Sequence, residues 1–126
     1  HVLLAEDDAF NQEIALMLLQ DVGQQADLAA DGREAVAKAE RRHYDLILMD
    51  MQMPHMDGLE AARRVRQIDG YGQVPIVALT GNAFAEDRAR CLAAGMDDFV
   101  TKPIDPPKLY RAMVQAYRRV DGGDNA

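Results

Sequence analysis

Five short runs of apolar residues recur along the chain, and a longer segment with helical character follows each of them. The runs cover residues 2–5, 26–30, 46–49, 76–79 and 99–101. Continuous apolar runs of about four or five residues are typical of strands that are buried on both faces, as in a parallel sheet. The second run predicts a strand least strongly, because Asp27 interrupts it and alanine is a poor strand former.

The segments that follow these runs predict five helices, at about residues 10–22, 32–42, 57–69, 84–94 and 106–119. Gly23 and Gly95 stand where a left-handed residue commonly ends a helix, and Pro106 and Pro107 suit a first helical turn. Five strand–helix units with short connections predict an α/β domain. Its core would be a doubly wound, five-stranded parallel sheet with helices on both faces.

The length of 126 residues fits a single domain. We predict a domain over residues 1–120, followed by a linker or frayed end over residues 121–126. The chain passes directly from His1 into an apolar run without an initiator methionine, so we expect a domain cut from a longer protein.

The chain is acidic, with 14 Lys and Arg residues against 21 Asp and Glu residues and a formal net charge of −7. This charge repels nucleic acids and anionic membranes, so neither is an expected partner. No apolar run approaches the roughly 20 residues that span a bilayer. The lone cysteine, Cys91, cannot form an internal disulfide, which fits a reducing compartment, and we therefore expect a cytoplasmic domain.

Polar side chains follow four of the five predicted strands at the point where each strand ends. They are Glu6, Asp7 and Asp8 after the first run, Asp50 after the third, Thr80 at the fourth and Lys102 after the fifth. Because parallel strands end at the same edge of a sheet, we expect these side chains to converge. Open α/β sheets bind their ligands at that edge.

Clustered carboxylates repel one another unless a proton or a cation lies between them, and Mg²⁺ prefers such oxygen ligands. Lys102 and Thr80 suit phosphoryl oxygens, and Asp50 is the best candidate for a carboxylate that attacks phosphorus to form an acyl phosphate. Helix capping and solvated surface positions explain the same residues equally well, so the residues alone leave both interpretations open.

Five motifs in order resemble the receiver domain of two-component response regulators, and the resemblance extends from Val2 to about Val120. The motifs are residues 3–8 (LLAEDD), 45–54 (DLILMDMQMP), 56–58 (MDG), 75–80 (PIVALT) and 97–103 (DDFVTKP). The sequence NQ at residues 11–12, together with MDMQMP, is most similar to receivers attached to hybrid histidine kinases. The resemblance implies a flavodoxin-like fold with strand order 2-1-3-4-5.

The resemblance also implies a metal site. Asp50 would accept the phosphoryl group and touch Mg²⁺, for which Mn²⁺ would substitute. Asp7 would be a direct ligand, Glu6 would act mainly through metal-bound water, and the backbone carbonyl of Gln52 would complete the coordination. The three acids in a row also allow Asp7 and Asp8 as the pair; we prefer Glu6 and Asp7, which leaves Asp8 as a helix cap.

The same resemblance implies that Thr80 and Phe99 change position when the domain is phosphorylated. Thr80 and Lys102 would bind phosphoryl oxygens, and Phe99 would turn inward when Thr80 moves. The peptide bond from Lys102 to Pro103 would be cis. Gly81 follows Thr80 where alanine is commoner in the family, which would leave this loop looser.

The implied partner is a histidine kinase or a histidine phosphotransfer domain that donates from phosphohistidine, and the family also allows a phosphorylation-dependent dimer. The parent would be a hybrid kinase, which tethers the domain to a membrane, or a stand-alone regulator. The domain's own catalysis would be limited to Mg²⁺-assisted transfer and slow self-hydrolysis. A metal-dependent phosphohydrolase with Asp50 as nucleophile is an alternative, although Gln52 stands where its general acid commonly lies. A further alternative is an interaction domain that keeps the fold but is not phosphorylated.

The first predicted helix offers a candidate docking surface. At about 100° per residue, one side gathers several residues that we expect to face the sheet. These residues are Phe10, Asn11, Ile14, Met17, Leu18 and Val22. Leu16 and Leu19 would then point outward and form an apolar patch for a helical phosphotransfer partner.

Overall fold

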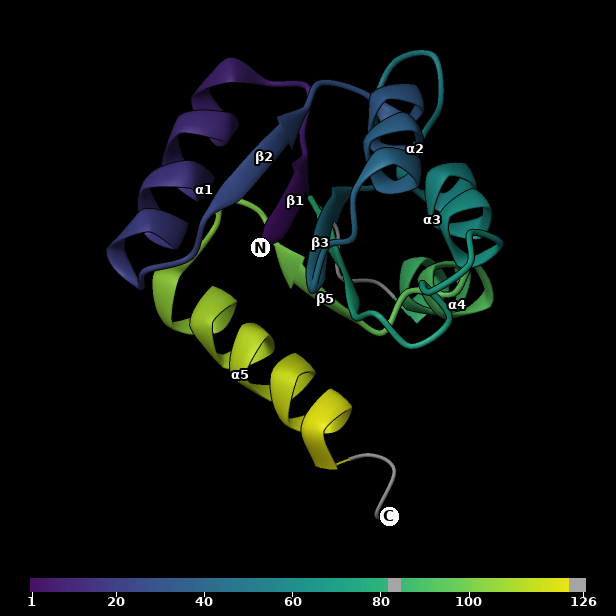
Figure 1. Ribbon diagram of the computed structural model, residues 1–126. Coiled ribbons are helices and arrows are strands. Elements are labelled where there is room, and N and C mark those ends of the chain that lie inside the picture. The colour runs from purple at the N-terminus through teal and green to yellow at the C-terminus, as the bar shows by residue number, and fades with distance from the viewer. Residues whose placement is uncertain (82–84, 123–126) are drawn as a thin grey trace.

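Five strands alternate with five helices in the computed structural model (Figure 1), which describes the backbone of residues 1–81 and 85–122 and the side chains of residues 1–81 and 88–119. The strands are β1 (Val2–Ala5), β2 (Ala26–Ala29), β3 (Leu46–Asp50), β4 (Ile76–Thr80) and β5 (Asp98–Thr101). The helices are α1 (Ala9–Asp21), α2 (Gly32–Arg41), α3 (Gly58–Arg66), α4 (Ala85–Ala93) and α5 (Pro106–Gly122). None of the described helices combines the length and the apolar character needed to cross a membrane.

The strands form one parallel sheet in the order β2-β1-β3-β4-β5, which confirms the predicted architecture and order. Alternate strand residues point to opposite faces, so the continuous apolar runs bury both sides of the sheet. One face packs against α1 and α5, and the other packs against α2, α3 and α4. This two-sided burial explains why the strands lack an alternating polar pattern.

Most element ends lie within three residues of the predicted ones. Strands β3 and β4 each extend one residue further and include Asp50 and Thr80. Gly23 and Gly95 have φ values of 76° and 96°, which confirms left-handed residues after α1 and α4. Helix α5 continues through Gly122, so the first two residues of the predicted tail are helical; residues 123–126 lie outside the described part of the chain.

The predicted orientation of α1 is wrong in part, although Leu18 is buried and Ile14 packs partly against the core as predicted. Leu19 is fully buried and Leu16 packs partly against the core, whereas Phe10 and Met17 are 69% and 56% exposed. The buried side of the helix is centred on Ala15, with Leu19 beside it. Apolar residues surround most of this helix, so their spacing does not determine which side faces the sheet. Leu16 and Leu19 therefore do not form an outward patch.

Candidate functional site

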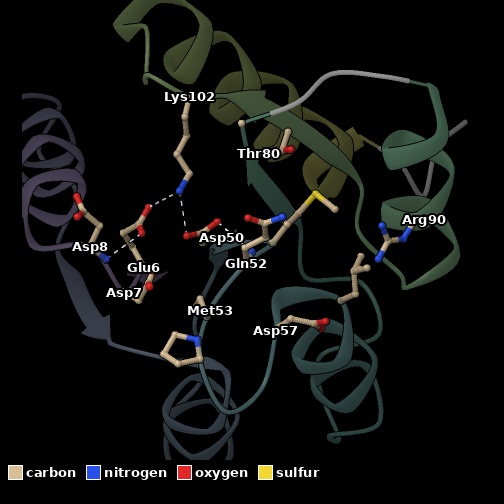
Figure 2. Close-up of a pocket in the computed structure, with 14 residues that line it drawn as sticks. Glu6, Asp7, Asp8, Asp50, Gln52, Met53, Asp57, Thr80, Arg90 and Lys102 are labelled. Atoms are coloured by element: carbon tan, nitrogen blue, oxygen red, sulfur yellow. Dashed lines mark hydrogen bonds and ion pairs between the residues drawn. The ribbon is translucent and has the colours of Figure 1, made fainter.

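The six residues predicted to form a metal and phosphoryl site line one cavity of about 1020 Å³ at the carboxyl ends of the strands (Figure 2). They are Glu6, Asp7, Asp50, Gln52, Thr80 and Lys102. Up to 96 residues separate them in sequence, and the parallel sheet brings them together because β1, β3, β4 and β5 all end at this edge.

Backbone hydrogen bonds fix the acidic side chains at the ends of their strands. The N–H of Glu6 donates to the carbonyl of Ala29 at 3.0 Å, which continues the β1–β2 ladder by one residue. The N–H of Gln52 donates to Asp50 Oδ1 at 3.2 Å, which orients that carboxylate from its own loop. Both carboxylates are therefore held by backbone that belongs to, or directly follows, the central strands.

The Lys102 ammonium lies between two buried carboxylates. Its Nζ is 2.9 Å from Asp50 Oδ2 and 3.1 Å from Glu6 Oε1, as Figure 2 shows. The Glu6 side chain is fully buried and Asp50 is 3% exposed. Two carboxylates this deep would repel each other strongly, so the ammonium stabilises the arrangement by compensating part of their charge.

Burial is the main cause that raises the pKa of the Glu6 carboxyl, to about 7. The hydrogen bond from the N–H of Asp8 opposes this effect, and the nearby Asp50 carboxylate adds to it. Burial lowers the pKa of Lys102, but its hydrogen bonds to Asp50 and Glu6 outweigh this and raise the pKa overall. The ammonium therefore stays charged, and the site carries excess negative charge once Glu6 ionises.

Three carboxylates are placed to hold a cation. Glu6, Asp7 and Asp50 each offer an oxygen, and these oxygens lie within 4.8 Å of one another. Hard divalent cations with oxygen ligands suit such a set. Asp8 accepts a hydrogen bond from the N–H of Asn11 at 2.9 Å and caps α1, as expected.

Phe99 lies outside this cavity. It is half-buried on β5, where the Arg88 guanidinium of α4 lies 4.5 Å from the ring centroid. The peptide bond between Lys102 and Pro103 is cis, as the resemblance implies. It follows directly on the β5 strand end, beside the side chain that bridges the two acids.

Two further charged residues line the cavity and were not predicted. Asp57 caps α3 by accepting a hydrogen bond from the N–H of Glu60 at 2.9 Å, a pattern that the Asp-x-x-Glu spacing could have indicated. Arg90 reaches the cavity from α4, and no spacing in the sequence indicates its position. Figure 2 places both on the side of the cavity away from Glu6.

The sequence matches the family described as the response regulator receiver domain over residues 2–114. The signal transduction histidine-protein kinase BarA of Escherichia coli K12 is 36% identical over 114 residues, which cover 90% of this chain and 12% of that kinase. Hybrid signal transduction histidine kinase I of Dictyostelium discoideum is 41% identical over 119 residues, which cover 89% of this chain and 7% of that protein. The chain thus spans only a small part of these relatives.

Solved structures share the whole fold. The receiver domain of a sensor histidine kinase from Pseudomonas aeruginosa has a magnesium ion coordinated in its active site cleft. It is 42% identical with a TM-score of 0.85, covering 95% of this chain and 96% of that chain. Chemotaxis protein CheY4 of Vibrio cholerae is 34% identical with a TM-score of 0.87, covering 91% of this chain and 96% of that chain.

Proposed function

The chain belongs to the response regulator receiver family, and on that premise we propose that it accepts a phosphoryl group from a phosphohistidine onto Asp50. The observation that carries this assignment is the position of the Asp50 carboxylate. It ends a central strand, lies against the Lys102 ammonium and shares a cavity with Thr80, Glu6 and Asp7. Glu6 also contacts Lys102 and accepts a backbone N–H on its other oxygen, but it follows the end of β1. Asp50 differs because it is itself the last residue of a strand, β3.

In the transfer, an Asp50 oxygen attacks phosphorus, the bond from phosphorus to the donor nitrogen breaks, and the imidazole leaves with that electron pair. Lys102 and Thr80 bind the phosphoryl oxygens, and Phe99 turns inward as Thr80 moves. Glu6, Asp7, Asp50 and the carbonyl of Gln52 would hold Mg²⁺. When bound, the ion would neutralise charge on the phosphoryl oxygens.

The donor would be a histidine kinase or a histidine phosphotransfer domain, because two of the relatives that match this chain are histidine kinases. The parent would then be a hybrid kinase. We place the domain in the cytoplasm, where ATP supplies the phosphoryl group of such a donor.

Incubation with acetyl phosphate and Mg²⁺ should add one phosphoryl group to the wild type, detected by intact-protein mass spectrometry. The Asp50→Asn variant should show no adduct, because an amide cannot form the acyl phosphate. Asp57→Asn is the matched control, since Asp57 lines the same cavity but caps a helix. This control should retain the adduct.

Other outcomes would contradict the proposal in distinct ways. An adduct on Asp50→Asn would place the phosphoacceptor elsewhere. Rapid hydrolysis of diverse phosphate esters would indicate a phosphohydrolase. A wild type that gives no adduct with acetyl phosphate or with a phosphorylated histidine phosphotransfer domain would indicate an interaction domain.

Mg²⁺ affinity should rise about tenfold between pH 6 and pH 8, because Glu6, with its pKa raised to about 7, must lose its proton as the cation binds.

In the metal-free protein, the stability of the fold should change with pH in the opposite direction and fall as the pH rises. A carboxyl whose pKa is higher in the folded state makes the fold less stable as pH rises from about 4.5 towards 7. Fluorescence titration and thermal melting measure the two trends. Glu6→Gln should flatten both, and unchanged trends in that variant would assign them to another group.

A further inference from the structure

A side chain of α1 holds the loop that carries the acids after β1. The side-chain Nε2 of Gln12 donates to the backbone carbonyl of Glu6 at 2.7 Å, in a partly buried position. The N–H of Glu6 still donates to Ala29 in the β1–β2 ladder, whereas its carbonyl accepts from this amide. Gln12 belongs to the sequence NQ at residues 11–12, and the proposed function gives it no role.

The bonded carbonyl belongs to the peptide unit that joins Glu6 to Asp7. A peptide unit is planar, so holding its oxygen restricts the rotation of the whole unit, including the Cα atoms at both ends. The two carboxylates start from these Cα atoms, and each contributes an oxygen to the candidate cation site. The hydrogen bond from Gln12 therefore limits the directions in which both acids reach the cavity.

Gln12 is itself anchored to the same loop. Its N–H donates to the carbonyl of Asp8 at 2.9 Å in the first turn of α1, and the N–H of Asp8 donates to Glu6 Oε2 at 3.1 Å (Figure 2). Asp8 also caps the helix by accepting from the N–H of Asn11. Residues 6–12 are thus closed into a ring of hydrogen bonds, in which the Gln12 side chain restrains the Glu6 carbonyl.

An amide suits this place because it donates a hydrogen bond without carrying a charge. Glu6, Asp7 and Asp8 follow one another, and their carboxylates repel. A loop under such repulsion needs a restraint to keep two acids directed at one point, and ligands that are already in place bind more tightly. A cationic side chain would compensate the negative charge that attracts the metal, whereas an amide leaves that charge intact.

We propose that Gln12 is a positioning residue for the cation site, and that its amide holds the peptide between Glu6 and Asp7 so that both carboxylates face one Mg²⁺. Gln12 is not among the residues that line the cavity, so it acts through the acids and does not touch the cation. This role rests on the proposed function, which requires the cation. Removing a group that orients metal ligands typically lowers metal affinity by about ten- to a hundredfold.

Calorimetric titration of Mg²⁺ into the metal-free protein tests this role. Gln12→Met keeps the length of the side chain but has no donor, and it should bind Mg²⁺ about tenfold more weakly than the wild type. Gln20→Met is the matched control, because Gln20 is exposed on the same helix, and its affinity should stay within about twofold. Without metal, the amide hydrogen of Asp8 should exchange about fivefold faster in Gln12→Met, since the ring of hydrogen bonds is opened.

Gln12→Glu separates the effect of position from that of charge. Glutamate has the size of glutamine but lacks the amide donor at neutral pH, and it adds a negative charge that would by itself strengthen Mg²⁺ binding. A positioning role predicts that this variant also binds Mg²⁺ more weakly than the wild type. Tighter binding by Gln12→Glu would overturn the proposal and show that only the charge at this position matters.

The remaining outcomes distinguish this inference from the proposed function. Equal Mg²⁺ affinities of Gln12→Met and the wild type, with both folded by circular dichroism, would overturn the role of Gln12 alone. A wild type that binds Mg²⁺ but takes up no phosphoryl group would overturn the proposed function, while a tenfold loss of affinity in Gln12→Met would still support the positioning role. A wild type that binds no Mg²⁺ would overturn both.

Discussion

Replacing Arg66 with methionine should lower the free energy of unfolding by about 3 kcal/mol. The guanidinium donates to the carbonyls of Tyr71 and Val74 at 2.6 Å and of Gly95 at 2.9 Å, and lies 2.8 Å from Asp97 Oδ2. The Arg66→Met change would remove one arginine from the half-buried Asp97 carboxylate. It would also leave the three carbonyls without the guanidinium as donor. Losing one partner of a buried, hydrogen-bonded pair costs more than the pair itself contributes.

Chemical denaturation of the variant measures this loss, and Arg64→Met is the matched control. Arg64 lies on the same helix and is exposed, and among the described side chains its one ion pair is with Glu60 at 3.1 Å, so its loss should cost about 0.5 kcal/mol or less. The loss of unfolding free energy in Arg66→Lys should lie between those of Arg66→Met and Arg64→Met, because an ammonium keeps the charge but not the planar set of donors. Equal stability of the Arg66→Met and Arg64→Met variants would show that the network contributes nothing beyond a surface pair.

The network around Arg66 also shows why part of the fold cannot be predicted from the sequence. Its partners lie in the α3–β4 connection and before β5, and they share no spacing that marks them as neighbours. The strands are different, because continuous apolar runs predict two-sided burial directly. Their parallel order then places every strand end at one edge, which is why the convergence of Glu6, Asp50, Thr80 and Lys102 was predictable.

The α1 helix shows a different limit. Apolar residues on several sides make more than one orientation plausible, and packing against the sheet and α5 in the assembled fold decides between them. The Tyr110 hydroxyl donates to the carbonyl of Leu18 at 3.0 Å, 92 residues away in sequence. Such a contact exists only in the assembled fold, so the exposure of Phe10 and the burial of Leu19 follow from packing and not from local pattern.

Gly58→Ala should disturb the phosphoacceptor more than any other small-to-small change near the site. A Cβ on Gly58 would lie 2.1 Å from the carbonyl oxygen of Asp50 and 3.0 Å from Met51 Cα. Both neighbours are backbone, so they cannot rotate away as a flexible side chain could. The N–H of Gly58 also donates to the carbonyl of Met51 at 2.9 Å, which holds the start of α3 against the end of β3.

The methyl group therefore has to move either α3 or the strand end by about 1 Å, which should cost about 3 kcal/mol of stability. A shift of this size at Asp50 should also slow phosphorylation from acetyl phosphate by about tenfold or more. Gly72→Ala is the matched control for stability, because a Cβ there meets no atom within 4 Å.

Gly32→Ala separates the two effects. Its Cβ would lie 2.3 Å from the carbonyl oxygen of Met56, so it strains the loop after β3 without touching Asp50. Gly32→Ala should therefore lose stability but keep a larger share of the phosphorylation rate than Gly58→Ala does. If both variants are slowed equally at equal stability, the loop as a whole positions the carboxylate, and the contact between Gly58 and the Asp50 carbonyl has no special role.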